Sequence, residues 1–254
     1  MHKPNALVVT IDLEKAFELC NSDVILYLLS KKGIKGRLLQ WVKDFLHGRT
    51  SQTLLQGYLS SSRAFENGTP QGSSLSPLLF NLVMEELLTI PHGADTYLCS
   101  FADDLTIVIV GRTALEEARQ ALKLMEAKCE ELGLKINVKK TEALQIKQQQ
   151  QFNNLKIQGK IVKFVDSHKI LGIILHQSLQ WNAHISYMME RIRPRLNIMR
   201  AMTSYKLGLN IKILRTFYVA CIRSIVDYAA PSLITAPAGI IARLEKMQNE
   251  LYAS

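Results

Sequence analysis

Several features that would assign other classes of protein are missing from the 254-residue sequence. It has only four cysteines, widely spaced and without a C-x-x-C pair, so neither a zinc site nor a disulfide framework is indicated. No apolar run approaches the ~18 residues that a membrane-spanning helix needs. The first residues, Met1–Asn5, lack the apolar stretch of a signal peptide. We therefore expect an intracellular protein with reduced thiols and no contact with a membrane.

Acidic residues are scarce in the C-terminal part of the chain. Residues 151–254 carry 14 Lys and Arg against 5 Asp and Glu, whereas residues 1–150 carry 17 of each kind. The whole net charge of +9 therefore lies in the C-terminal part. This asymmetry indicates a polyanionic partner bound mainly there, although a solvated basic face would give the same count.

The sequence does contain an adjacent pair of acids inside an apolar stretch. Residues 97–111 read YLCSFADDLTIVIVG, with apolar and β-branched residues on both sides of Asp103 and Asp104. The pattern predicts two strands joined by a tight turn that carries the acids. Because two crowded like charges are costly unless a cation lies between them, the pair suggests a divalent metal, magnesium above all. A solvated Asp-Asp turn is the alternative.

A further carboxylate stands at the end of another expected strand. Residues 7–11 form an apolar, β-branched run that ends at Asp12, and helical periodicity follows directly. If this strand pairs with the acidic hairpin, Asp12, Asp103 and Asp104 meet at one edge of a sheet. Three acids can hold two divalent ions, and a two-metal site suits in-line phosphoryl transfer, with one ion activating the attacking hydroxyl and the other neutralising the leaving pyrophosphate.

The remaining periodicity predicts a mixed α+β architecture. We expect helices over 14–30, 36–47, 75–88 and 114–132, a β-ribbon over 49–67, short strands within 135–175 and three helices over 182–252. Pro194 lies inside the first of these last helices and should kink or split it.

Five short motifs follow one another along the chain. They are Asp12–Phe17 (DLEKAF), Gly68–Asn81 (GTPQGSSLSPLLFN), Phe101–Asp104 (FADD), Gly133–Thr141 (GLKINVKKT) and Ile170–Ile173 (ILGI). In sequence and in order these motifs resemble those of reverse transcriptases, and they are most similar to the enzymes of non-LTR (LINE-type, jockey-like) retrotransposons.

The resemblance implies a right-hand polymerase palm, in which an antiparallel sheet packs on helices, followed by a helical thumb. It assigns residues 1–175 to the palm with partial fingers and residues 176–254 to a truncated thumb or connection. Most of the fingers, which normally precede the first motif, are expected to be absent from this sequence.

The resemblance also implies an activity, RNA-directed DNA polymerisation. The expected partners are an RNA template, a DNA primer and dNTPs, with no membrane, and the oligomeric state stays unknown. The expected cofactor is two Mg²⁺ ions, with Mn²⁺ as an alternative, held by Asp12, Asp103 and Asp104. Lys140 would lie near the triphosphate and protonate the leaving pyrophosphate. Such a protein would act in the cytoplasm and nucleus, within the ribonucleoprotein of its element.

Three residues are implied in binding the incoming nucleotide. Phe17 stands where the family has an aromatic steric gate, whose ring leaves no room for a ribose 2′-hydroxyl. Without the resemblance, Phe17 would be read first as a core residue of the helix over 14–30, and the matched spacing after Asp12 is what favours the gate. Gln71 and Gly72 lie in a loop of turn-forming residues, where Gln71 could donate hydrogen bonds and glycine lets the backbone approach a ligand.

Four residues near the C-terminus are implied in holding nucleic acid. Leu171 and Gly172 resemble the hairpin that grips the primer, although a plain buried strand fits the same residues. Arg191 and Arg195 interleave with an apolar stripe of helical period and would reach phosphates of the primer–template duplex. Packing of that stripe explains its apolar members but not its arginines.

Other classes remain as alternatives to this interpretation. A catalytically inactive remnant that still binds nucleic acid would keep the same fold. An RNA-dependent RNA polymerase also uses paired aspartates, but Phe17 argues against it because such an enzyme must accept the 2′-hydroxyl. Enzymes of the group II intron type are closer, and the pattern over 169–254 favours the LINE type.

Overall fold

The computed structural model describes residues 5–147, 154–203 and 208–249, which fall into two compact units, Met1–Val165 and Asp166–Ser254. The first unit therefore ends before the boundary expected after residue 175. The reason is that the hairpin formed by β12 (Ser167–Ile170) and β13 (Ile173–His176) packs with the helices that follow it, with Ile173 against their apolar core. The two units are described separately below.

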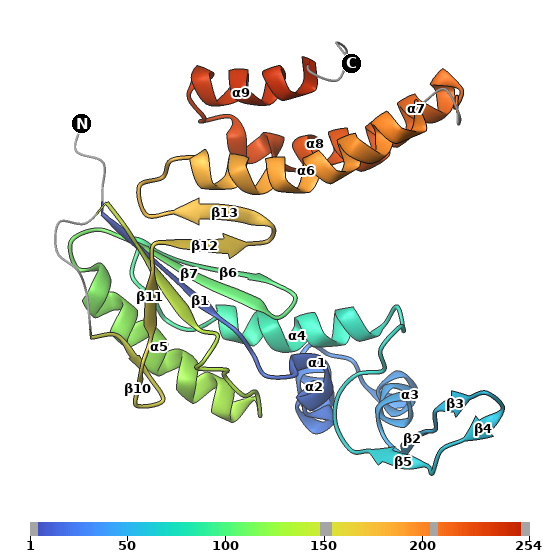
Figure 1. Cartoon of the computed structure of the whole chain (residues 1–254). Helices are drawn as coiled ribbons and strands as arrows, with labels where there is room; N and C mark the ends of the chain where they lie inside the picture. The colour runs from blue at the N-terminus through green and yellow to red at the C-terminus, as the bar shows by residue number, and fades with distance from the viewer. Residues whose placement is uncertain (1–4, 148–153, 204–207, 250–254) are drawn as a thin grey trace. The chain divides into compact units, whose positions relative to one another are not determined.

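A five-stranded sheet forms the centre of the first unit, in the order β11-β8-β1-β7-β6 (Figure 1). The pairs β1–β7, β1–β8 and β6–β7 are antiparallel, and β11 pairs with β8 in parallel. The strands are β1 (Ala6–Ile11), β6 (Thr96–Phe101), β7 (Asp104–Val110), β8 (Glu142–Ile146) and β11 (Lys163–Val165). The antiparallel centre agrees with the expected palm sheet.

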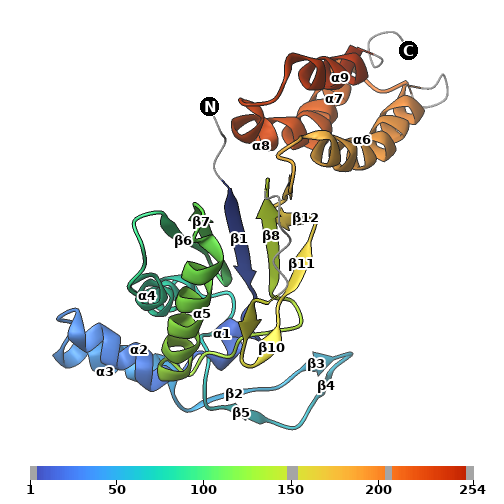
Figure 2. The same cartoon turned by 90° about the vertical axis from the view of Figure 1, so that its left-hand side faces the viewer.

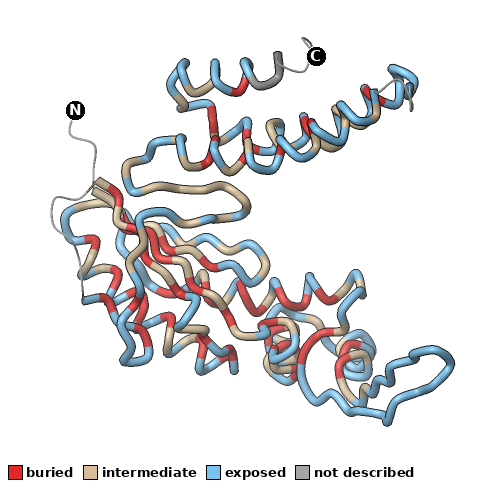
Figure 3. Tube along the Cα trace, in the orientation of Figure 1, coloured by how far each residue is buried: buried red, intermediate tan, exposed pale blue. Residues whose placement is uncertain are grey.

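Two long helices, α4 (Ser76–Leu88) and α5 (Ala114–Glu131), cover one face of this sheet (Figure 2). Alternate strand residues such as Leu7, Val9 and Ile107 point to them and are fully buried, because successive side chains of a strand point to opposite faces. Figure 3 shows the buried positions gathered along these strands and helices. Asp12 and Asp104 are in the other phase of the alternation, so they belong to the opposite face.

Shorter elements follow β1 and return to α4. The expected helix over 14–30 is two helices, α1 (Ala16–Leu19) and α2 (Ser22–Lys31), because Asn21 caps α2 by accepting hydrogen bonds from the N–H groups of Asp23 and Val24. Next comes α3 (Gly36–Leu46), as expected. An exposed ribbon then follows, with strands β2 (Arg49–Ser51), β3 (Leu54–Leu55), β4 (Tyr58–Leu59) and β5 (Arg63–Phe65). A small hairpin of β9 (Lys156–Ile157) and β10 (Lys160–Ile161) lies near α5.

The second unit contains the β12–β13 hairpin and a set of helices around their own apolar core. The helices are α6 (Asn182–Met202), α7 (Ile211–Phe217), the π-helical segment η1 (Tyr218–Arg223), α8 (Ser224–Leu233) and α9 (Ala238–Asn249). Because α7, η1 and α8 run on without a break, three helical stretches result, as expected. Pro194 does not split α6, since Ile192 and Leu196 are buried on both sides of it and their packing offsets the lost hydrogen bond.

One buried histidine joins the hairpin of the second unit to its helices. His184 on α6 is 1% exposed, and its Nδ1 accepts a hydrogen bond from the backbone N–H of Ile174 at 3.3 Å. Its Nε2 is buried without a hydrogen-bond partner. Burial lowers the pKa of His184, because the charged imidazolium loses its hydration there.

Within the part of the chain that the structure describes, no helix has both the length and the apolar character needed to cross a membrane.

Candidate active site

The register of the sheet brings two of the expected carboxylates to the same edge. Strand β1 pairs with β7 so that Ile11 lies opposite Leu105. Continuing this register by one residue sets Asp12, directly after β1, opposite Asp104, the first residue of β7. Both belong to the face of the sheet away from α4 and α5, because their neighbours Ile11 and Leu105 are buried against the core.

Asp103 is carried by the tight turn between β6 and β7. The turn has only two residues, Ala102 and Asp103, because Phe101 already pairs with Asp104. Ala102 has a φ of 52°, in the left-handed region that costs an L-residue about 1–2 kcal/mol, and it is the only one of the two with positive φ. This is the pattern of a type II′ turn, which suits the twist of a hairpin. The strained turn holds Asp103 out into solvent beside Asp104.

A lysine completes the charge pattern next to Asp12. The Nζ of Lys140 lies 3.6 Å from Oδ2 of Asp12, whose side chain is 32% exposed. Backbone contacts hold the two segments together: the N–H of Asn137 donates to the carbonyl of Asp12 at 2.8 Å, and that of Glu14 donates to Lys135 at 2.7 Å. Because the lysine is 69% exposed, this ion pair adds little stability, and the ammonium is free to move toward an anionic ligand.

The donor set at this edge fits a magnesium site in kind. Its expected ligands, Asp12, Asp103 and Asp104, offer only carboxylate oxygens, the ligands that Mg²⁺ prefers. The side chains are not gathered around one point, since the described residues contain no group of three or more His, Cys, Asp or Glu side chains placed to hold an ion. The backbone therefore sets these carboxylates on one edge, and a bound ion would have to draw their side chains together.

Phe17 is held from two sides close to this edge. Its ring stacks on Phe80 of α4, with ring centroids 4.1 Å apart and planes at 30°, and Phe80 is fully buried. On the backbone side, its carbonyl accepts a hydrogen bond from the N–H of Thr69 at 2.9 Å. Phe17 is partly exposed, so it is both a packed residue and an accessible ring.

Gly68 makes the contact between the second motif and Phe17 possible. It has a φ of +83°, and a Cβ at this position would lie 2.6 Å from the carbonyl oxygen of Glu18 and 2.7 Å from that of Phe17. Its N–H donates to the carbonyl of Cys20 at 2.7 Å. Only glycine fits such an approach of two backbones, so this residue fixes the loop against α1.

Arg49, which the sequence did not single out, secures the same loop from the other side. Its Nη2 donates to the carbonyls of Asn67 at 2.8 Å and Gly68 at 2.7 Å, and its Nε donates to Leu46 at 2.8 Å, at the end of α3. Burial lowers the pKa of Arg49. Its hydrogen-bond partners are backbone carbonyls, so no pattern of residue types in the sequence predicts these contacts.

Gln71 and Gly72 lie on the exposed part of this loop, just before α4. Gly72 has a φ of +88° and nothing within 4 Å of the position of a Cβ, so the chain turns freely there. The hydroxyl of Ser76, the first residue of α4, donates a hydrogen bond to the carbonyl of Pro70. This bond ties the loop to the helix. Gln71 and Gly72 are therefore accessible to a ligand, on a loop whose two ends are anchored.

In the second unit, a tyrosine secures the turn that contains Leu171 and Gly172. The two residues join β12 to β13 with φ of 46° and 83°. The hydroxyl of Tyr228, on α8, donates to the carbonyl of Leu171 at 2.6 Å, and a ring carbon of Tyr228 lies 3.3 Å from the position of a Cβ on Gly172. Leu171 is thus in a turn rather than in a strand, and Tyr228 is a residue that the motif did not include.

Arg191 and Arg195 lie on α6 of the same unit. The guanidinium of Arg191 and the ammonium of Lys169 each lie 5.5 Å from the centre of the Tyr187 ring, within range of a cation–π contact. Arg195 donates to the carbonyl of Arg191. Lys169 and Arg191 lie against the Tyr187 ring, and Arg195 lies one turn further along α6; we call the surface with these three cations the Tyr187 face.

The sequence matches a protein-family model and is similar to several known proteins. Residues 1–194 match the model of the family described as reverse transcriptase (RNA-dependent DNA polymerase). The chain is 23% identical over 234 residues to an RNA-directed DNA polymerase from the mobile element jockey of Drosophila melanogaster, covering 87% of this chain and 25% of that protein. It is 26% identical over 252 residues to a probable RNA-directed DNA polymerase from transposon BS of the same species, covering 95% and 28%. The chain thus spans about a quarter of the length of these relatives.

A solved structure agrees with the fold. A telomerase from Candida tropicalis, determined in complex with a fragment of telomeric RNA, superposes with a TM-score of 0.53 over 91% of this chain and 39% of its own, at 11% sequence identity. This likeness shows an α+β polymerase-like fold. The family match over residues 1–194, more than half of the sequence, shows that the chain belongs to the reverse transcriptase family.

Proposed function

We propose that this chain is the polymerase part of a non-LTR retrotransposon reverse transcriptase, which adds dNTPs to the 3′-hydroxyl of a DNA primer on an RNA template. The observation that carries the proposal is the sheet register, which sets Asp12 opposite Asp104 beside the exposed Asp103. Family membership supports the same activity.

The chemistry at this edge is in-line phosphoryl transfer. Asp12, Asp103 and Asp104 would hold two divalent ions, Mg²⁺ or in its place Mn²⁺, which activate the 3′-hydroxyl and neutralise charge on the leaving pyrophosphate. Lys140 would release Asp12 and place its ammonium at the triphosphate, where it can protonate the pyrophosphate. The backbone hydrogen bond that the N–H of Asn137 donates to the carbonyl of Asp12 keeps the lysine within reach of the carboxylates.

Selection of the sugar would depend on Phe17. With Phe80 stacked behind it and Thr69 bonded to its carbonyl, the Phe17 ring cannot withdraw easily from a nucleotide sugar. A rigid ring beneath the sugar leaves a 2′-hydroxyl neither room nor a hydrogen-bond partner. Gln71 and Gly72, on the loop that Gly68 and Arg49 anchor, would contact the incoming nucleotide.

The second unit would hold the duplex of primer and template. Arg191 and Arg195 on the Tyr187 face supply positive charge for phosphates, and the turn at Leu171 and Gly172 would support the primer end. The same proposal puts the protein in the ribonucleoprotein of its element, in the cytoplasm and the nucleus.

Primer extension tests this function. The substrate is poly(rA) with an oligo(dT) primer, dTTP and Mg²⁺, and the variant is Asp103→Asn with Asp104→Asn. We expect extension by the wild-type chain and none by this variant. The matched control, Asp44→Asn with Asp95→Asn, makes the same charge change at exposed positions and should extend normally. Salt-sensitive duplex binding without extension by any of these proteins would instead support a nucleic-acid-binding remnant.

A further inference from the structure

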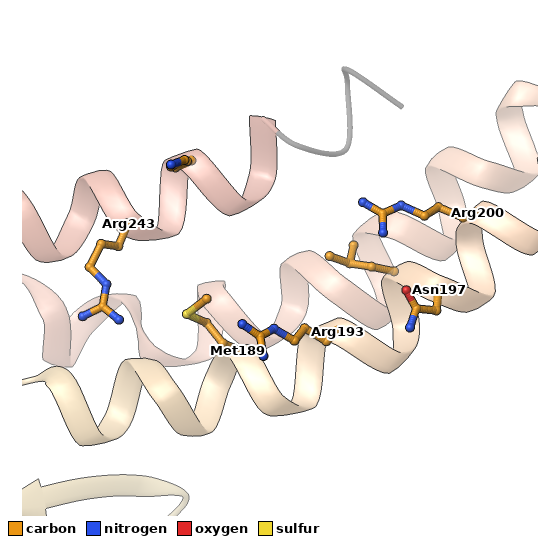
Figure 4. Close-up of a pocket in the computed structure, with 7 residues that line it drawn as sticks. Met189, Arg193, Asn197, Arg200 and Arg243 are labelled. Atoms are coloured by element: carbon orange, nitrogen blue, oxygen red, sulfur yellow. The ribbon is translucent and has the colours of Figure 1, made fainter.

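A pocket of about 500 Å³ lies between α6 and α9 in the second unit, away from every residue assigned so far. Its walls carry four exposed cations, Arg193 and Arg200 from α6 and Arg243 and Lys246 from α9. In Figure 4 the guanidinium groups of Arg193, Arg200 and Arg243 point into the space between the helices. The described residues that line the pocket include no Asp or Glu.

Helical spacing explains how the cations come together. Arg193, Asn197 and Arg200 are separated by four and three residues, so they share one side of α6. Arg243 and Lys246 are three residues apart and share one side of α9. The acid between them in sequence, Glu245, lines a different pocket.

The charges in the pocket make it suited to an anion. Like charges brought together destabilise the fold unless a counter-charge lies among them. The Nη1 of Arg243 donates to Oδ1 of Asn182 at 3.0 Å, which orients that guanidinium but adds no negative charge. Arginine binds phosphate through two parallel N–H groups, and Asn197 adds a neutral donor beside the arginines.

This pocket is separate from the Tyr187 face. Arg191 and Arg193 are two residues apart, which corresponds to about 200° of rotation around a helix. Arg191 lies against the ring of Tyr187, whereas Arg193 lines the pocket toward α9. Helix α6 therefore presents basic residues on two opposite sides, and one nucleic-acid duplex lying on the Tyr187 face would leave the pocket unfilled.

We infer that the α6–α9 pocket binds backbone phosphates of a second, single nucleic-acid strand while the Tyr187 face holds the primer–template duplex. The inference rests on the proposed function, which makes nucleic acid the source of the phosphate groups. A concave site of this volume has the size of a small-molecule pocket, which suits one or two phosphates of a flexible single strand.

The test measures binding of labelled oligo(U) RNA to the full chain already saturated with a primer–template duplex, over a range of salt concentrations. The pocket variant is Arg193→Gln with Arg200→Gln. Since each phosphate contact with a single strand contributes about 0.7 to the slope of log K against log salt, we expect this variant to lower the slope by about 1.4. Arg193→Lys with Arg200→Lys keeps the charge and should keep the slope, and thermal melting monitored by circular dichroism verifies that each variant is folded.

Two controls make the result specific. Lys212→Gln with Arg215→Gln removes the same charge from the exposed surface of α7 and should leave the slope unchanged. Arg191→Gln with Arg195→Gln should lower the slope for the duplex and not for oligo(U). If the pocket variant changes oligo(U) binding no more than the α7 variant does, the inference is wrong.

Inorganic tripolyphosphate separates the two sources of phosphate. If unlabelled RNA displaces the labelled oligo(U) and tripolyphosphate at the same phosphate concentration does not, the pocket binds a nucleic-acid strand. If the pocket variant loses tripolyphosphate binding but binds oligo(U) as the wild-type chain does, the assignment to nucleic acid is wrong. These readouts need no polymerisation, so a chain that binds oligo(U) through the pocket but extends no primer would contradict the proposed function alone.

Discussion

Replacing Gly68 by alanine tests how the second motif supports Phe17. The new Cβ would lie 2.7 Å from the carbonyl oxygen of Phe17 and 2.6 Å from that of Glu18, and these are backbone atoms that cannot swing away. The positive φ of +83° alone costs an L-residue about 1–2 kcal/mol. Forcing two backbones apart adds about 1–3 kcal/mol, as in an overpacked core. We therefore expect Gly68→Ala to lower the free energy of unfolding of the first unit by about 2–5 kcal/mol.

Gly57 provides the matched control, because its φ of +86° is nearly the same but nothing lies within 4 Å of the position of its Cβ. Gly57→Ala should lose only the conformational part, about 1–2 kcal/mol. The assay is urea unfolding followed by the fluorescence of Trp41 on α3, in a Trp181→Phe background so that only the first unit is observed. If the two alanine variants lose the same free energy of unfolding, the close approach of Gly68 to α1 is refuted.

Three further predictions concern single residues. Phe17→Val should raise incorporation of ribonucleotides relative to deoxynucleotides about tenfold or more, whereas Phe17→Tyr, which keeps the ring, should not. Single-nucleotide primer extension measures this ratio. An unchanged ratio in Phe17→Val would contradict the steric gate. Tyr228→Phe should lose about 0.5–1.5 kcal/mol of local stability with the hydrogen bond to Leu171, seen as amide exchange two- to tenfold faster in the β12–β13 hairpin and not in α5. Because burial lowers the pKa of His184, the unfolded state binds a proton first as the pH falls below about 6.5, so the stability of the second unit should decline from there at up to about 1.4 kcal/mol per pH unit. His184→Asn, followed by the fluorescence of Trp181, should flatten this decline, and the same decline in the variant would show that another group causes it.

The sequence could predict what depends on local pattern. The strand before Asp12, the acidic hairpin and the helices expected over 75–88 and 114–132 have clear periodicities, and their positions are confirmed. The pairing of β1 with β7 was a condition of the predicted carboxylate edge, and the structure has it. What the sequence could not supply is how far the three carboxylate side chains approach one another, since that depends on rotamers and on bound ions.

The contacts that support the site come from distant parts of the chain. Tyr228 is 57 residues from its partner Leu171, and Arg49 is 19 residues from the Gly68 carbonyl that it binds. Local periodicity predicts neither contact, because the acceptors are backbone carbonyls, which every residue has. The first compact unit ends at Val165 for a related reason: Ile170–Ile173 resembles a palm motif, but its hairpin packs on the helices that follow it.

Binding of Mn²⁺ is the measurement that tests the central claim most directly. Electron paramagnetic resonance would follow Mn²⁺ in a complex of the chain with an RNA template, a dideoxy-terminated DNA primer and the matching dNTP, so that no reaction occurs. If Asp12 and the hairpin acids form one site, Asp12→Asn and Asp103→Asn should each weaken binding, and the two together should weaken it by less than the sum of their separate effects, since residues that share one site are coupled. Mn²⁺ binding as tight in both variants as in the wild-type chain and in Asp44→Asn with Asp95→Asn would contradict the metal site at this edge.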